Sequence, residues 1–179
     1  MIGLALGVLL ALSPAFAGDG IALDVERGKM YWTQKGGDNA GVGVIRRANM
    51  EIPKGQDPAN CQDIETLFSG LPEPIDVDLD LSSRKMYWTD RGDLPRGNTV
   101  NRGPMDPPKK FDPKNRADQE ILTGDLKEGI GIALEVKSGR MFFTDLAEMS
   151  TRRSLTDPRK VLLAGQGSLT GIAFAEFGK

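Results

Sequence analysis

Residues 76–90 read DVDLDLSSRKMYWTD, and this stretch decides the fold because the chain repeats it. Residues 20–34 read GIALDVERGKMYWTQ, and residues 131–145 read GIALEVKSGRMFFTD in the same register. A fourth copy begins with GIAF at residues 171–174. The first three copies start 55–56 residues apart. A fixed period of this kind indicates a repeat architecture, in which each copy is one supersecondary unit.

Each copy has the pattern of short antiparallel strands. Ile21 and Leu23 alternate with Ala22 and Asp24, which is the period-2 pattern of a half-buried strand. The MYWT and MFFT segments are rich in the aromatic and β-branched residues that favour strands. Tight hairpin turns are expected between these two strands, at residues 27–28, 83–84 and 138–139.

Two further strands complete each unit. A third strand is expected near residues 42–48 and 99–102, and closing strands at residues 66–70, 121–124 and 161–165. Four antiparallel strands repeated at a fixed period form the blade of a β-propeller. The chain is therefore predicted to be all-β, with about three four-stranded blades. The predicted blades are residues 20–70, 71–124 and 125–165, with a partial blade at 166–179.

The residues quoted above resemble one known family. Tyr87-Trp88-Thr89-Asp90, preceded by the strand that ends at Asp80, resembles the YWTD repeat of the low-density lipoprotein receptor class B family. In that family six blades close a ring, aromatic side chains pack between sheets, and Thr and Asp link neighbouring blades by hydrogen bonds. The first copy departs from the pattern at Gln34, which weakens the expected link there. The resemblance implies structural roles for Trp32, Trp88, Thr89, Asp90, Thr144 and Asp145.

Three blades do not close a ring of the usual four to eight. The favoured interpretation is a fragment or half of a six-bladed propeller. In a second one, two chains of three blades each form a homodimer that closes a six-bladed ring. In a third, a strand at residues 169–177 completes a blade whose other strands come from the N-terminus.

Residues 1–17 are almost wholly apolar and end in Ala15-Phe16-Ala17. This pattern is typical of a secretory signal peptide, so we expect a secreted protein with no membrane span in the mature chain. The alternative is the remnant of a preceding strand, in a protein that would then be cytoplasmic.

The composition excludes several kinds of chemistry. The sequence has no histidine and only one cysteine, so it offers no His-based nucleophile pair, intrachain disulfide or Cys-rich metal site. Its formal net charge of −2 gives no general attraction for nucleic acid. We expect no cofactor. The series Asp76-Asp78-Asp80 could suggest a Ca²⁺ site, but the Gly turn and distal Glu of an EF-hand are missing, which favours a charged rim or hydrogen bonds between blades.

One loop is a candidate for partner recognition. The segment after the second YWTD strand carries three Arg and two Asn in twelve residues, and these side chains are good hydrogen-bond donors. Loops that connect strands gather on one face of a propeller, where binding often occurs. The alternative is a solvated insertion, in which Arg91-Gly92-Asp93 is simply a turn. The predicted recognition residues are Arg91, Asp93, Arg96, Asn98, Asn101 and Arg102.

These observations favour a non-enzymatic binding or scaffold module for a protein or another extended ligand. The alternatives are a fragment of a six-bladed hydrolase of the gluconolactonase or strictosidine-synthase-like type, or a truncated product without independent function. An enzyme of that type needs carboxylates or a metal that converge on one site. Here Asp24, Asp80 and Glu135 recur once per blade, as structural residues do.

Overall fold

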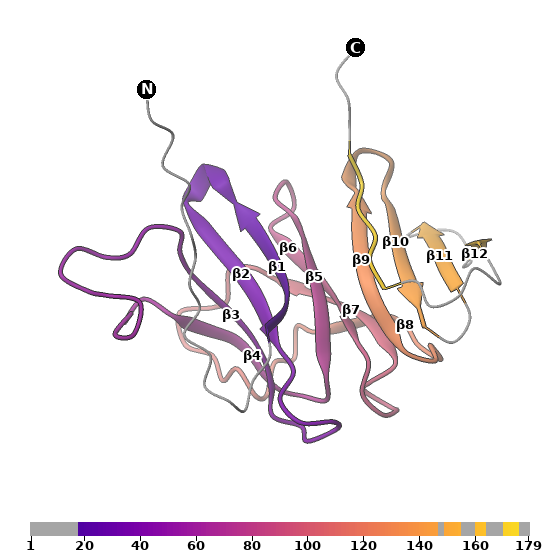
Figure 1. Ribbon diagram of the computed structural model, residues 1–179, viewed down its shortest axis with the longest axis horizontal. Helices are drawn as coiled ribbons and strands as arrows, with labels where there is room; N and C mark the ends of the chain where they lie inside the picture. Colours follow the sequence, from indigo (N-terminus) through magenta and orange to yellow (C-terminus); the bar gives the residue numbers. More distant parts are fainter. Residues whose placement is uncertain (1–17, 147–148, 155–159, 164–169, 176–179) are drawn as a thin grey trace, which may run out of the picture.

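The computed structural model describes residues 18–146, 149–154, 160–163 and 170–175. Three antiparallel sheets of four strands each stand side by side, and within each sheet the strands follow the order of the sequence (Figure 1). The predicted all-β fold with three four-stranded blades is therefore confirmed. The proposed signal peptide at residues 1–17 lies outside the described residues.

The strand bounds are close to those expected from the repeats. The first blade contains β1 (Gly18–Asp24), β2 (Lys29–Gln34), β3 (Gly43–Asn49) and β4 (Glu65–Leu71). The second contains β5 (Pro74–Asp80), β6 (Lys85–Asp90), β7 (Thr99–Pro104) and β8 (Glu120–Thr123). The third contains β9 (Gly129–Glu135), β10 (Arg140–Asp145), β11 (Met149–Ser154) and β12 (Lys160–Leu163).

The hairpin between the first two strands of each blade turns through one left-handed residue. In the first and third blades a short 3₁₀ turn, η1 (Val25–Arg27) or η2 (Val136–Ser138), is followed by a glycine with φ near 60°. Glycine adopts this conformation at no steric cost. The second blade has Arg84 at the same position, with φ of 55°. The expected turns are confirmed, and Arg84 is a non-glycine residue at a position that favours glycine.

Adjacent aromatic residues of the YWTD strand face opposite neighbours, because successive side chains of a strand point to opposite faces. Trp88 packs toward the first blade, with its ring centroid 4.9 Å from that of Phe68, whereas Tyr87 packs toward the third blade. The expectation that aromatic positions pack between sheets is confirmed for Trp88. The first junction buries Tyr31, Ile45, Leu67, Phe68, Leu71, Val77, Leu79, Met86, Trp88 and Met105, and the second buries Tyr87, Val100, Leu126, Ile132, Met141 and Phe143.

The threonine of the YWTD strand links neighbouring blades at their innermost strands. The Thr33 hydroxyl accepts a hydrogen bond from the amide of Gly20 on its own blade and donates one to the carbonyl of Ile75 on the next, at 2.9 and 2.5 Å. Thr89 donates in the same way to the carbonyl of Ile130 at 2.5 Å. The link that was in doubt at the first blade is thus present, through Thr33.

The aspartate of the motif has a different role from the one expected. Asp90 accepts a hydrogen bond from the amide of Glu73, which lies in the linker between the first and second blades. Asp145 accepts bonds from Lys127 and Glu128, just before its own first strand. In both blades the aspartate therefore holds the linker that enters its own blade. At the first blade Gln34 instead accepts a bond from Arg46 on the adjacent strand.

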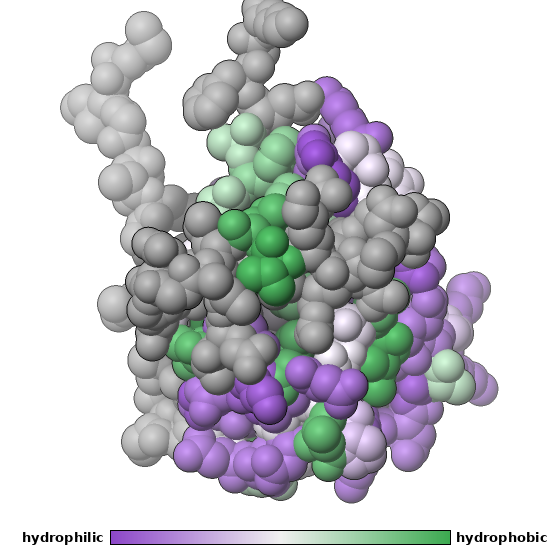
Figure 2. Space-filling model, turned by 90° about the vertical axis from the view of Figure 1, so that its right-hand side faces the viewer, coloured by the Kyte–Doolittle hydropathy of each residue, from purple (hydrophilic) through white to green (hydrophobic). Residues whose placement is uncertain are grey.

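The two outer faces of the array are open within the described structure. Ile21 and Leu23 are 54% and 47% exposed, although the equivalent residues of the second blade, Val77 and Leu79, are buried. On the other side, hydrophobic residues are visible among hydrophilic ones in the view from the third blade (Figure 2). The exposed hydrophobic residues of this region include Val136, Val161, Leu162 and Phe174.

The segment predicted to begin a fourth copy lies beside the third blade. Residues 170–175 run along β9 (Figure 1), and the carbonyl of Thr170 is 2.9 Å from the point that a Cβ on Gly131 would occupy. None of these six described residues is assigned to a strand. The described part of this segment therefore follows the position of a next innermost strand without pairing in a sheet.

A long loop of the second blade covers the outer edge of the first. Residues 105–119 connect β7 to β8 and fold back onto β4. The amide of Ser69 donates to the carbonyl of Pro113 at 2.8 Å, and the Arg116 guanidinium donates to the carbonyl of Leu67 at 2.8 Å. The same guanidinium lies 4.3 Å from the ring of Phe68. These contacts provide hydrogen-bond partners for backbone groups of an edge strand, which would otherwise be free to pair with other chains.

Candidate recognition surface

Each blade has two ends, and the candidate site lies at one of them. We call the end where the chain passes from one blade to the next the linker end, and the opposite end, with the hairpin turns, the hairpin end. The loop at residues 35–42, the linker at 72–73 and the loop at 91–98 meet at the linker end, in the lower part of Figure 1. Asp93 and Asn39 join the two loops, because the amide of Asp93 donates to the Asn39 side chain at 2.5 Å.

Beneath these loops lies a buried acidic residue with two cationic partners. Glu73 is 2% exposed, and its carboxylate accepts hydrogen bonds from Lys35 at 3.1 Å and from Arg91 at 2.6 Å. The amide of Arg91 also donates to the carbonyl of Glu73 at 2.9 Å. A buried carboxylate needs such partners, because an unpaired charge out of water is costly. The contacts fix the start of the 91–98 loop to the linker.

Asp90 completes the base of this loop. One carboxylate oxygen accepts bonds from the amides of Glu73 and Gly92, at 2.9 and 3.1 Å. The other oxygen is buried and has no hydrogen-bond partner among the described residues. Burial raises the pKa of Asp90 to about 7, even though the two amide bonds act in the opposite direction. Asp90 is therefore a structural carboxylate that is easily protonated.

The loop itself is tightly folded and has an exposed tip. The amide of Gly97 donates to the carbonyl of Asp93 at 2.8 Å, and a Cβ on Gly97 would lie 1.9 Å from the carbonyl oxygen of Gly92. Only glycine fits at this approach. Between these residues Leu94 is 58% exposed, and Arg96 is exposed beside it. The tip thus presents an apolar side chain between an acid and a base.

The structure divides the six predicted recognition residues. Asp93 and Arg96 lie exposed at the tip of the loop. Arg91 is partly exposed and is paired with Glu73, while Asn98 is a partly buried residue at the base of the loop. Its carbonyl accepts a bond from Leu126.

The last two predicted residues lie on β7, away from this surface. Asn101 is fully buried, and its side chain bonds Thr99 and Gln119, so its assignment to a recognition surface was wrong. Arg102 pairs with Glu120 and lies 5.8 Å from the ring of Tyr87. Both residues lie outside the loop, because the loop ends at Asn98 and the strand begins at Thr99.

Three residues of the surface were missed from the sequence. Leu94 is a single apolar residue in a polar loop, so the sequence pattern does not distinguish it. Asp38 and Asn39 belong to the equivalent loop of the first blade, and Asp38 lies 3.5 Å from the Arg91 guanidinium. The signal was available, since both loops follow a YWTD strand at the same place in the repeat. We call Asp38, Asn39, Asp93, Leu94 and Arg96 the linker-end surface.

The aspartate series of β5 is a structural feature. Asp76 and Asp78 accept hydrogen bonds from the amides of Ile132 and Leu134 on β9, at 2.9 and 2.8 Å. Asp80 bonds the serines of its own hairpin. Of the two alternatives, hydrogen bonds between blades are confirmed for Asp76 and Asp78. Within the described ranges, no three His, Cys, Asp or Glu residues are grouped so that they could hold a metal ion.

No helix in the described part of the chain has the length and apolar character needed to cross a membrane.

Two curated fungal proteins are similar in sequence. The chain is 38% identical to the low-density lipoprotein receptor-related protein 1 of Pyricularia oryzae over 156 residues, which are 86% of this chain and 49% of that protein. It is 37% identical to the 3-hydroxyacyl-CoA dehydrogenase-like protein LAM1 of Cochliobolus heterostrophus over 167 residues, 87% of this chain and 34% of that protein. The chain thus spans half or less of the relatives it matches. No family model matches it.

Solved structures with the same fold are propellers. A chain of the nidogen/laminin complex superposes with a TM-score of 0.67 at 21% identity, covering 90% of this chain and 54% of that one. The Cps50 (Swd1) β-propeller domain of Myceliophteria thermophila gives a TM-score of 0.52 at 8% identity, covering 89% and 47%. The repeats, the four-stranded blades and these similarities agree. The chain is built from YWTD-type β-propeller blades that are similar to those of the low-density lipoprotein receptor class B family.

Proposed function

We propose that this chain is a non-enzymatic module that binds a protein or another extended ligand through its linker-end surface. One observation carries the proposal: an exposed loop tip, Asp93 to Arg96, stands on a base that is buried and ion-paired through Glu73. The surface lies where the first and second blades meet, and that junction is complete within the described structure. The proposal therefore does not depend on what covers the open outer faces.

The fixed base favours binding. Ordering a flexible loop at an interface costs free energy that is subtracted from the affinity, so a loop already held in one conformation binds more tightly. Here Arg91, Gly92 and Gly97 hold both ends of the loop, and Asn39 contacts its middle. The ligand would meet a surface that is already arranged.

The chemistry of the tip suits a protein ligand. Interfaces commonly combine a central side chain that becomes fully desolvated with polar groups around it. Leu94 is the apolar centre here, and Asp93, Arg96 and Asp38 give both signs of charge around it. The nidogen chain that shares the fold was crystallised in a complex with laminin, which supports protein binding by this kind of domain.

A catalytic interpretation of Asp90 is less well supported. A carboxylate with a strongly raised pKa can mark an active site. However, Asp90 is 1% exposed, and one of its oxygens binds the backbone of the linker and the loop. A substrate would have to displace these structural contacts. We therefore propose a structural role for Asp90 and no enzymatic activity for the chain.

Selection of a displayed random-peptide library on the immobilised chain tests the proposal. We expect the enriched peptides to lose at least about tenfold in affinity in Leu94→Ala and Arg96→Ala, because a desolvated anchor is worth more than 1 kcal/mol. Lys109→Ala is the matched control, since Lys109 is exposed on the loop at the other end of the same blade. If the selected peptides bind both loop variants as tightly as the native chain, the linker-end surface is not the binding site. One tight divalent-metal site, or hydrolysis of lactones, would reject the non-enzymatic assignment.

A further inference from the structure

The hairpin end carries two equivalent sites, one at each blade junction, and they differ at one decisive position. At the first junction Arg84 reaches across from the second blade, and its guanidinium donates to the Asp24 carboxylate at 2.6 Å. Asp24 is nearly completely buried. The repeat places Asp80 at the position of Asp24, Tyr87 at that of Tyr31, and Gly139 at that of Arg84.

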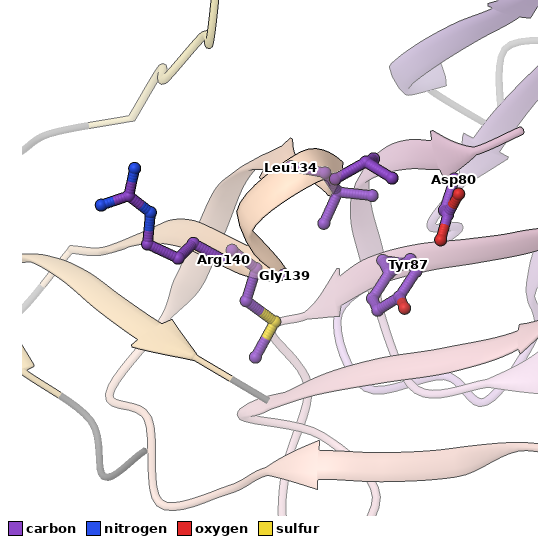
Figure 3. A pocket seen from close by; sticks show the side chains of 7 residues that line it. Asp80, Tyr87, Leu134, Gly139 and Arg140 are labelled. Carbon is purple, nitrogen blue, oxygen red and sulfur yellow. The ribbon is translucent and has the colours of Figure 1, made fainter. Parts of the chain in front are cut away.

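At the second junction the guanidinium is replaced by a pocket. Gly139 has no side chain to reach Asp80, and a pocket of about 50 Å³ remains between the second and third blades. One water needs about 10–15 Å³ by the same measure, so a larger group fits. Figure 3 shows Asp80 and Tyr87 together on one side of this pocket and Gly139 opposite them. Leu134 and Met141 add apolar walls.

The neighbouring arginine does not fill this pocket. The Arg140 guanidinium points away from Asp80 and Tyr87 in Figure 3. It pairs with Glu135, and its Nε donates to the Ser138 hydroxyl at 2.8 Å. Glu135 and Ser138 thus hold the guanidinium on its own hairpin.

Asp80 brings a negative charge to the pocket. Its carboxylate accepts hydrogen bonds from the hydroxyls of Ser82 and Ser83, at 2.6 and 2.5 Å. These bonds hold the pKa of Asp80 below its ordinary value, although partial burial acts in the opposite direction. Hydroxyl groups satisfy lone pairs but carry no charge, and the described residues include no Lys or Arg in a salt bridge with Asp80. Lys85, on the adjacent strand, directs its ammonium group to Glu120.

We propose that this pocket is a receptor for a guanidinium group, presented as an arginine side chain by a protein partner. The first junction provides the precedent within the same molecule, because there the repeat holds an arginine against the equivalent aspartate. A planar guanidinium donates to a carboxylate while its flat face packs on apolar and aromatic walls. The partner's arginine would take the place that Arg84 takes at the first junction. This site is at the opposite end from the linker-end surface and is independent of it.

Titration of the whole chain with N-acetyl-arginine amide, followed by NMR, tests the proposal. We expect shifts at Gly139 and Tyr87, and binding at least about tenfold weaker for the neutral N-acetyl-citrulline amide, because hydrogen bonds to charged groups are the stronger ones. Asp80→Asn should weaken binding of the arginine probe by a similar factor. Gly139→Arg should abolish it, since the chain would then supply its own guanidinium.

The repeat offers a matched control for the last variant. Gly28→Arg places the same side chain at the same left-handed position of the first hairpin, where no atom lies within 4 Å of the added Cβ. It should leave binding unchanged. Arg84 already adopts this backbone conformation, so arginine is compatible with the turn. The proposal is overturned if Asp80→Asn binds the arginine probe as well as the native chain, or if the citrulline probe binds equally. Should Gly139→Arg not fold, the Asp80→Asn result decides alone.

Discussion

The two blade junctions join nearly identical sheets by different polar chemistry. Both use the threonine bond between innermost strands and a core built from alternating aromatic residues. At the first junction, glycine at position 20 lets the innermost strands approach closely, and Arg84 bonds Asp24 across the hairpin end. At the second junction, carboxylates of β5 bond the backbone of β9, and the hairpin end is left with a pocket.

The difference shows which parts of the repeat are interchangeable. The threonine bond and the aromatic alternation recur at both junctions, so they define how blades stack. The positions equivalent to Gly20 and Ala22 carry Asp76 and Asp78 in the second blade alone. In a repeat protein each unit contacts mainly its neighbours, so one junction can change its chemistry without altering the next. Variation between blades is therefore where individual sites can arise.

The largest expected effect is a loss of stability that should differ between the hydrophobic clusters of the two blade junctions. Trp88→Ala should lower the free energy of unfolding by about 3–5 kcal/mol, because it empties the centre of the larger cluster. Phe143→Ala, at the equivalent position of the second junction, should cost less, since its side chain is smaller and so is its cluster. Urea unfolding of both variants measures the difference. Equal losses would mean that cluster size does not distinguish the junctions.

A smaller effect tests the carboxylates that join β5 to β9. Asp76→Ala and Asp78→Ala should each cost about 1–2 kcal/mol, because each leaves an amide of β9 without its acceptor. Hydrogen exchange should rise at Ile132 and Leu134 and not in the first blade. Asp112→Ala is the control, since that carboxylate bonds only its own exposed loop. If all three variants were equally stable, the contrast between the junctions would be lost.

The smallest effect at a single, neutral pH compares one aspartate of the motif in two blades. Both oxygens of Asp145 accept backbone bonds, whereas one oxygen of Asp90 has no partner among the described residues. Asparagine keeps one acceptor oxygen. Asp145→Asn should therefore cost about 1 kcal/mol at neutral pH, and Asp90→Asn should cost little.

The Asp90 substitution should also change how stability depends on pH. Its pKa is raised to about 7 in the folded chain, so the folded state binds more protons than the unfolded state between about pH 4 and 7. Native stability from this group is thus greatest at low pH and falls as pH rises through 7. Relative to the native chain, the free energy of unfolding of Asp90→Asn should rise by on the order of 4 kcal/mol between pH 4 and pH 8. Thermal unfolding across this range measures it, and parallel pH profiles would contradict the raised pKa.

Much of the fold was predictable because short stretches of the sequence determine the strands and turns of each repeat. The alternation in residues 20–24, the turn glycines and the YWTD strand each specify structure over a few residues. Hydrogen bonds between blades were one of the two expectations for Asp76 and Asp78, because carboxylates at period 2 on a strand face one side. The structure identifies the donors of these bonds as backbone amides of β9.

The sites were harder to predict because they depend on contacts between blades. Arg84 meets Asp24 across sixty positions, and no local pattern links them. Asn101 was wrongly placed on the surface because the sequence does not distinguish a polar residue on a strand from a polar residue in a loop. The pocket beside Asp80 is visible only when Gly139 is compared with Arg84 in three dimensions. The sequence alone does not show which side chains are long enough, and suitably placed, to contact a residue on the neighbouring blade.

The loop that covers β4 has a consequence for synthesis of the chain. Strand β4 ends at Leu71, but the carbonyl that caps its Ser69 amide belongs to Pro113. At about 5–20 residues per second, a ribosome needs some seconds to add the intervening segment. During this time the newly made first blade presents an uncapped edge to other nascent chains and to chaperones. The first blade thus acquires the cap on its edge strand only after the ribosome has translated the β7–β8 loop of the second blade.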